Sequence, residues 1–235
     1  MRAPSMADPS LVARCSASLI ALLVLSSSVP APAQTPTPAH DHDNFACQPD
    51  GLARNKASGC QLLAQPIIDK LPDAPVFWHL TTFPTRRAAD AAKRSGDAVV
   101  TADGRVWLSS IGSRSDTSAR GKHVAAIGPL PMPKASAYRV EMYYVIMPPH
   151  QHTRVHTHPG PEAWYVLEGE QCLDTPAGVF RARRGAGSVA PPAGTAMQLT
   201  NSGTTMRRAL YIVVHDTAQM WTTPSDWQPS GACAR

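Results

Sequence analysis

Short runs of alternating apolar and polar residues, separated by turn residues, occupy most of the chain after residue 75. Alternation with a period of two predicts half-buried β-strands. We expect strands at 76–83, 99–101, 106–111, 123–127, 138–147, 162–167, 170–175, 179–183, 188–190, 197–201 and 209–215. Many short strands with frequent Gly and Pro between them predict an all-β sandwich, barrel or jelly roll.

The strand predicted at residues 138–147 is apolar on both faces. Val140 and Met142 fall on one face, and Tyr143 and Val145 fall on the other. A strand that is apolar on both faces belongs inside a sandwich or barrel.

One segment has the pattern of a helix rather than a strand. Thr85 is suited to cap its N-terminus, and the alanines that follow favour helix. Lys93 and Arg94 suit the last turn before Gly96 ends it. We therefore expect one surface helix at residues 86–94.

The first 33 residues have the pattern of an export signal. Arg2 and Arg14 supply positive charge, an apolar run covers residues 19–25, and Ala31-Pro-Ala33 fits a cleavage site. The apolar run is much shorter than the roughly 20 residues that span a bilayer. We predict a periplasmic or secreted protein with no stable membrane insertion.

The remaining chain divides by composition into four parts. We expect a flexible lead-in at 34–60, a β-rich extension at 61–119, a barrel at 120–218 and a C-terminal tail at 219–235. The whole chain has 235 residues and a net charge of +5, which falls to +4 without the export signal. So small a positive excess gives no support to a nucleic-acid partner.

Export would place four cysteines in an oxidising compartment, where they can form disulfides. Four cysteines allow three pairings, and the sequence does not choose among them. The simplest is Cys47 with Cys60 and Cys172 with Cys233, the second of which would tie the tail to the barrel. The alternative is that some are free, buried thiols.

The richest chemical feature is a run of histidines. Four of the nine histidines, His150, His152, His156 and His158, fall within nine residues, and Glu162 follows. Imidazole and carboxylate groups bind transition metals. Because residues i and i+2 of a strand share a face, His156 and His158 can point at one ion.

These residues also carry a family resemblance. His156-Thr-His158, then Glu162, then Gly169 matches the first signature of the cupin superfamily in residue type and spacing. The second signature is matched in part by Pro192, Gly194 and Asn201. It departs at position 197, where the family has a histidine and this chain has a methionine, and Gly185 and Gly187 straddle the expected place of another glycine.

The resemblance implies an all-β fold, the double-stranded β-helix or cupin jelly roll, with the β-rich N-terminal extension and one short helix added. It implies one divalent transition metal (Fe, Mn, Zn or Ni, with Cu less favoured) held by His156, His158 and Glu162. It also implies a homodimer, since cupins are often dimeric.

Met197 leaves three interpretations open. The two histidines and the glutamate can form a three-ligand set with open positions. Met197 can join them, which would favour copper, because a thioether is a poor ligand for Fe, Mn or Zn. Alternatively, Met197 has displaced the metal and the site is an apolar pocket.

Strand alternation places Trp164, Tyr211 and His215 beside the site as pocket residues. His215 would be a substitute ligand or general base. His150 and His152 match no signature position and can line the mouth, supply a replacement ligand or be solvated, and we expect the last of these. An apolar, aromatic pocket suits a small organic ligand.

We expect a metal-dependent enzyme of oxygenase or isomerase type. The alternative is a non-catalytic periplasmic protein that binds a small molecule or metal at a degenerate site.

Overall fold

The computed structural model describes residues 58–117, 120–189 and 191–234. The predicted export signal, most of the lead-in and Cys47 lie outside the described residues. The strands are β1 (Gly59–Ala64), β2 (Ile67–Ile68), β3 (Val76–Phe83), β4 (Ala98–Ala102), β5 (Arg105–Ser113), β6 (Lys122–Ile127), β7 (Tyr138–Met147), β8 (His156–Thr157), β9 (Glu162–Glu168), β10 (Glu170–Thr175), β11 (Gly178–Arg183), β12 (Gly187–Val189), β13 (Gln198–Thr200), β14 (Arg207–Asp216) and β15 (Thr223–Pro224). The all-β fold expected from the sequence is confirmed.

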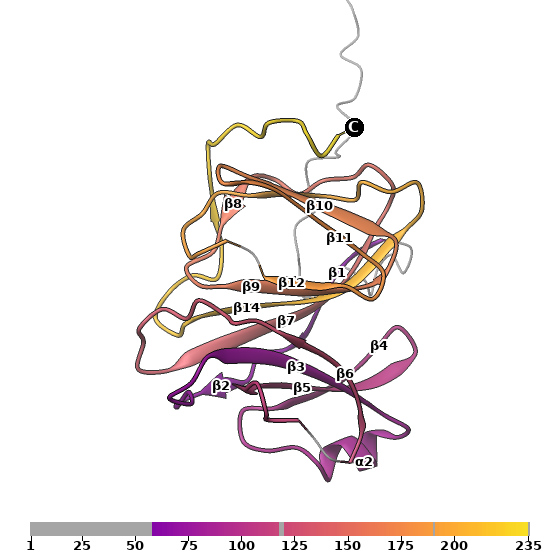
Figure 1. Cartoon of the computed structure of the whole chain (residues 1–235), viewed down its shortest axis with the longest axis vertical. Coiled ribbons are helices and arrows are strands. Elements are labelled where there is room, and N and C mark those ends of the chain that lie inside the picture. The colour runs from indigo at the N-terminus through magenta and orange to yellow at the C-terminus, as the bar shows by residue number, and fades with distance from the viewer. Residues whose placement is uncertain (1–57, 118–119, 190, 235) are drawn as a thin grey trace, which may run out of the picture. The chain divides into compact units, whose positions relative to one another are not determined.

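Two walls of antiparallel strands enclose the barrel (Figure 1). One wall is a sheet in the order β1-β7-β14-β9-β12, with β2 also paired to β7. The other consists of β11-β10-β13 and the short pair β15-β8. Apolar side chains from both walls pack together between them, among them Val145, Trp164, Leu173 and Tyr211. This arrangement is a double-stranded β-helix.

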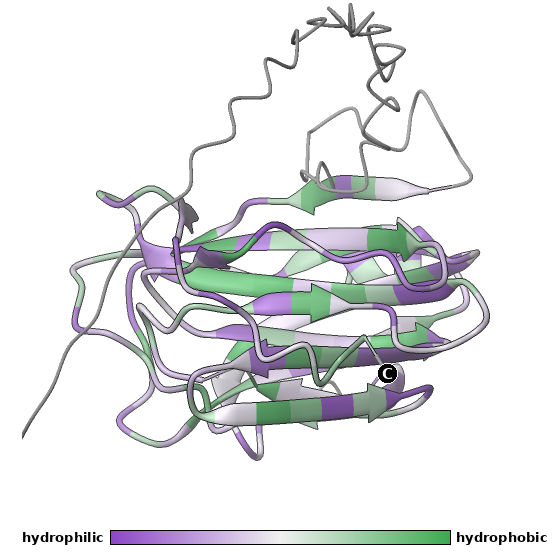
Figure 2. Ribbon diagram, turned by 90° about the horizontal axis from the view of Figure 1, so that it is seen from above, coloured by the Kyte–Doolittle hydropathy of each residue, from purple (hydrophilic) through white to green (hydrophobic). Residues whose placement is uncertain are grey.

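A further sheet, in the order β4-β5-β3-β6, packs on the outer face of the larger barrel wall (Figure 1). Trp78 and Trp107 of this sheet share one apolar cluster with Val140, Met142 and Ile212 of β7 and β14. Hydrophobic and hydrophilic residues alternate along many of the strands (Figure 2). Strands β7 and β14 are instead buried on both faces, because successive side chains point into the barrel and against the extension in turn.

The parts divide differently from the ranges expected from the sequence. Strand β6 pairs with β3 of the extension, although its residues were assigned to the barrel. Strand β1 pairs with β7 of the barrel, although its residues were assigned to the lead-in and extension. The range expected to form the barrel therefore contributes β6 to the sheet of the extension, and the residues before it contribute β1 to the barrel.

The described helix, α2 (Arg86–Asp90), begins where expected. Thr85 is its N-cap and accepts a hydrogen bond from the amide of Ala88 at 3.2 Å. The helix ends four residues before the predicted end, because the next amides, of Ala92 and Lys93, bond to carbonyls three residues back. Among the described residues, no helix is long and apolar enough to cross a membrane.

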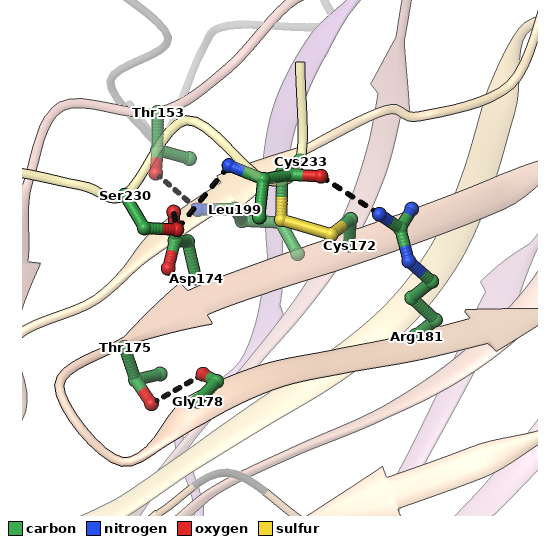
Figure 3. The surroundings of a disulfide bond; sticks show 10 residues. Thr153, Cys172, Asp174, Thr175, Gly178, Arg181, Leu199, Ser230 and Cys233 are labelled. Carbon is green, nitrogen blue, oxygen red and sulfur yellow. Dashed lines mark hydrogen bonds between the residues drawn. A yellow bond between two sulfur atoms is a disulfide. The ribbon is translucent and has the colours of Figure 1, made fainter. Parts of the chain in front are cut away.

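The predicted disulfide between Cys172 and Cys233 is confirmed (Figure 3). It joins β10 to the last described residues of the chain across a sequence separation of 61. The other expected pair requires Cys47, which lies outside the described residues.

Candidate metal centre

The three residues of the histidine motif lie at the adjoining ends of two strands. His156 opens β8, His158 follows it directly, and Glu162 opens β9. Strand β8 is too short to be fixed by its own pairing with β15. It is also held by an exchange of backbone hydrogen bonds between His156 and Met197, at 3.1 and 2.9 Å. The barrel walls thus fix the backbone of each candidate ligand.

The side chains of these residues converge. Their ligand atoms, one from each residue, all lie within 4.8 Å of one another. The Nε2 atom of His158 is 3.8 Å from Oε2 of Glu162, and the rings of His156 and His158 stand edge to face with centroids 4.8 Å apart. The sequence motif therefore brings two nitrogens and a carboxylate close enough together that one ion could be held among them.

Hydrogen bonds orient both imidazoles for metal binding. The Nδ1 atom of His156 lies 2.8 Å from the carbonyl oxygen of Arg154, and that of His158 lies 2.7 Å from the carbonyl oxygen of Trp221. A carbonyl oxygen only accepts, so each Nδ1 carries the proton. Each Nε2 is left with a lone pair, which is the arrangement found in histidines that bind metals.

Burial shifts the pKa values of all three candidate ligands. Burial, followed by the neighbouring His156, lowers the pKa of His158 to about 3, and burial also lowers that of His156. Burial raises the pKa of Glu162 to about 7, against the opposing charge of Arg207. Neutral imidazoles and a carboxyl group without a close cationic partner fit a divalent metal, whose charge would stabilise the ionised carboxylate.

A cavity of about 910 Å³ opens beside the three residues. Both apolar and polar side chains line it. The lining residues are Val145, Met147, His152, Thr153, Arg154, Val155, His156, His158, Glu162, Gln198, Leu199, Tyr211, Trp221, Thr222, Pro224, Ser225, Asp226, Trp227, Gln228 and Pro229. Eight of these twenty residues belong to the C-terminal tail, including two tryptophans that no sequence motif connects with the site.

Met197 lies next to the site without lining the cavity. It is bridged to His156, and residues bridged across antiparallel strands project to the same face. Its side chain is buried in the apolar cluster inside the barrel, together with Trp164 and Leu199. Trp164, expected to line the pocket, is buried in the same cluster inside the barrel and does not line the cavity, whereas Tyr211 lines it as expected.

His215 forms its closest polar contacts with groups other than the three candidate ligands. Its Nδ1 donates to the carbonyl oxygen of Asp216 at 2.8 Å, and its Nε2 faces Oε1 of Glu141 at 3.5 Å. Among the described residues, the group that could hold a metal consists of His156, His158 and Glu162 and does not include His215. His215 therefore lies against a buried carboxylate of β7, which differs from the expected role of substitute ligand.

The other two histidines of the run lie at the edge of the barrel. His152 lines the cavity, and its Nδ1 is 3.1 Å from the side-chain nitrogen of Gln198. His150 is exposed, as expected, whereas His152 takes the alternative role of lining the cavity.

Neither protein-family models nor curated proteins match the sequence. Among solved structures, the chain is similar to an uncharacterised double-stranded β-helix protein from Klebsiella pneumoniae (21% identity, 37% of this chain and 76% of that chain, TM-score 0.33). It is also similar to the oxalate decarboxylase of Lactobacillus farciminis in its formate complex (20% identity, 36% and 26%, TM-score 0.31). A third is a putative sugar phosphate isomerase from Acidithiobacillus ferrooxidans (20% identity, 38% and 70%, TM-score 0.29).

The strand order and the enclosed apolar cluster define the class of protein. Two facing walls with the His156, His158 and Glu162 motif on adjoining strand ends make this chain a protein of the cupin fold. One fold carries many activities, so function has to be argued from the site itself.

Proposed function

We propose that the protein is an exported, metal-dependent enzyme that acts on a small organic molecule held in the cavity beside His156, His158 and Glu162. The observation that carries this proposal is the orientation of the two imidazoles. Each has its Nδ1 proton bound to a backbone carbonyl and its Nε2 left to bind a metal. Histidines that were merely core residues would not need to converge on a buried carboxyl group.

The side chains in the cavity would divide the work of binding. His156, His158 and Glu162 would hold the metal, and two imidazoles with one carboxylate suit Fe, Mn, Zn or Ni better than copper. When bound, such a metal supplies a Lewis acid with open positions for substrate. Tyr211 and Trp221 would shield the substrate from water, because both line the cavity with aromatic surface.

The metal site is tested by replacing one ligand. We expect the purified protein to hold about one Fe, Mn, Zn or Ni per chain, and His156→Ala to lose most of it, because two ligands bind far more weakly than three. His150→Ala is the matched control, since it removes an exposed histidine of the same run. Elemental analysis measures both. Protein isolated without chelators that contains no metal, and takes up none when it is offered, would contradict the proposal.

The reaction type is tested with the metal-loaded protein. Oxygen uptake with candidate substrates supports an oxygenase, whereas exchange of substrate hydrogen with deuterated water, without oxygen uptake, supports an isomerase. Both activities should be absent in His156→Ala.

A non-catalytic binding protein is the second candidate, and Met197 favours it. The family's fourth ligand is replaced here by a thioether buried in an apolar cluster. Such a protein would bind the metal or a small molecule and turn over none of the substrates tested.

Export is supported by the disulfide. The bond between Cys172 and Cys233 is of the kind that persists in oxidising compartments and is rare in the cytosol. A periplasmic or secreted location is therefore part of the proposal.

A further inference from the structure

The C-terminal tail, residues 219–234, crosses the mouth of the barrel and is here called the strap. It follows β14, the last long strand, and residues 221–229 of it contribute Trp221, Thr222, Pro224 and Trp227 to the cavity wall. No part of the sequence motif lies in the strap. The strap nevertheless contacts the side chain of one of the three candidate ligands directly.

The contact is made by Trp221. Its carbonyl oxygen accepts the Nδ1 proton of His158 at 2.7 Å, and its indole ring stacks on the same imidazole with centroids 5.6 Å apart. The ring of Trp221 also packs against the ring of Tyr143, with centroids 5.3 Å apart. One residue of the strap thus fixes both the tautomer and the plane of His158.

The strap is held near β8 by backbone pairing. Thr223 pairs with Thr157 and Pro224 pairs with His156. The amide of Ser225 donates to the carbonyl of Val155 at 3.1 Å. A two-residue strand gives few hydrogen bonds, so this pairing alone holds the strap weakly.

The far end of the strap is anchored covalently to β10, which belongs to the same wall as β8 (Figure 3). Cys233 is bonded to Cys172 of β10. Two hydrogen bonds support this anchor: Ser230 donates to the carboxylate of Asp174 at 2.7 Å, and Arg181 donates to the carbonyl of Ala232 at 2.8 Å. The strap is therefore fixed at both ends, with Trp221 near the first and the disulfide at the second.

We propose that the strap is a structural part of the metal centre, in which Trp221 positions His158 and the Cys172–Cys233 disulfide keeps Trp221 in place. This rests on the proposed function in one respect, the binding of a metal by His158. The effect follows from hydrogen bonding: without the carbonyl of Trp221, the buried Nδ1 proton of His158 loses its acceptor. The ring then takes up the other tautomer, with the proton on Nε2, where a metal would have to bind.

The first test is metal affinity, measured with Zn(II) by competition with a chelating dye. Trp221→Ala keeps the backbone carbonyl but removes the ring that packs on His158 and Tyr143, so the strap and its carbonyl are free to move away from the Nδ1 atom of His158. This variant should bind Zn(II) about 10–100-fold more weakly, the usual effect of losing a group that orients a ligand. Trp221→Phe keeps an aromatic ring on His158 and should restore most of the affinity. The matched control is Trp227→Ala, which removes a second strap tryptophan from the same cavity and should bind Zn(II) as the wild type does.

The second test removes the anchor. Cys172→Ser/Cys233→Ser should also weaken Zn(II) binding, although neither residue lines the cavity. If this variant does not fold, Arg181→Ala/Ser230→Ala loosens the same anchor and leaves the disulfide intact. Wild-type affinity in Trp221→Ala, or in folded protein without the disulfide, would overturn the proposal.

A third measurement needs no metal. In ¹⁵N NMR spectra of the metal-free wild type, the His158 ring should show the Nδ1-protonated tautomer alone. Trp221→Ala and the cysteine variant should show a mixture, and Trp227→Ala should not. If the wild type binds no Zn(II) but these tautomers behave as expected, the proposed function fails while the positioning role stands. An unchanged tautomer in every variant would contradict the positioning role.

Discussion

At the scale of single residues, Gly160 restricts the path of the chain beside the candidate metal centre. It lies between His158 and Glu162, and a Cβ atom there would stand 1.8 Å from the carbonyl oxygen of Val214. The chain cannot simply move away, because the amide of Val214 donates to the carbonyl of Pro161 at 3.0 Å. The glycine is therefore required by close contact of two backbones.

Gly160→Ala should lower the free energy of unfolding by more than the roughly 1–3 kcal/mol typical of overpacked positions. Urea denaturation at equilibrium measures it. Gly203→Ala is the control, since a Cβ at residue 203 would meet its nearest neighbours at an ordinary 3.5 Å. Equal stability of the two variants would show that the loop adapts more readily than its bonding suggests.

At the scale of elements, Glu141 ties β7 to β14 and to the chain just after β1. Gln65 donates to its Oε2 at 2.6 Å, and His215 of β14 faces its Oε1 at 3.5 Å. Burial opposes ionisation of Glu141, but these two partners outweigh it and hold the pKa below the ordinary 4.5. The ionised carboxylate therefore stabilises the joint between the elements.

The pH dependence follows from the direction of that shift. A depressed native pKa means that the unfolded chain binds the proton more tightly, so the stabilisation is complete above pH 4.5 and is lost as the pH falls through the native pKa. Glu141→Gln should therefore be less stable than the wild type at pH 7, by a margin that narrows toward pH 3. Thermal unfolding across this range measures the margin. The control is Glu170→Gln, at an exposed position, which should change stability by less than about 0.5 kcal/mol throughout this range. If the stability difference between Glu141→Gln and the wild type did not depend on pH, this explanation would be ruled out.

Elements with a clear period were predictable from the sequence, and those fixed by distant partners were not. Residues 76–83, 138–147 and 170–175 form strands with the predicted bounds. Strand β1 was missed because it lacks alternation and is fixed by pairing with β7, about 80 residues further along the chain.

The candidate site was predictable to the same extent. The spacing of His156, His158 and Glu162 is local and was visible in the sequence, as was the neighbouring Tyr211. Trp221 was not, because its contact with His158 arises only when the strap returns over the barrel, a path that no local pattern encodes.

At the scale of the whole described structure, one apolar layer is shared by the extension and the barrel. Trp78 is completely buried in it, and its indole nitrogen donates to the hydroxyl of Ser109 at 2.9 Å. Because β7 and β14 contribute to both this layer and the inside of the barrel, we expect the two parts to unfold together.

Trp78→Ala should cost about 3–5 kcal/mol, as other large buried aromatic residues do. It should lower the unfolding midpoint of the barrel as much as that of the extension. Hydrogen exchange, resolved along the chain during urea unfolding, follows both parts. Loss of protection in the extension at a lower urea concentration than in the barrel would indicate two independent domains.

The shared layer also limits how two copies of the protein can associate. In a bare jelly roll, the outer faces of β7 and β14 would present Val140, Met142 and Ile212 to water, and an apolar surface of that kind attracts a partner. Here the extension of the same chain covers that surface. A homodimer, if it forms as the family resemblance predicts, has to use another surface, such as β11, where Val179 and Phe180 are exposed. The extension thereby selects the surfaces that remain for assembly.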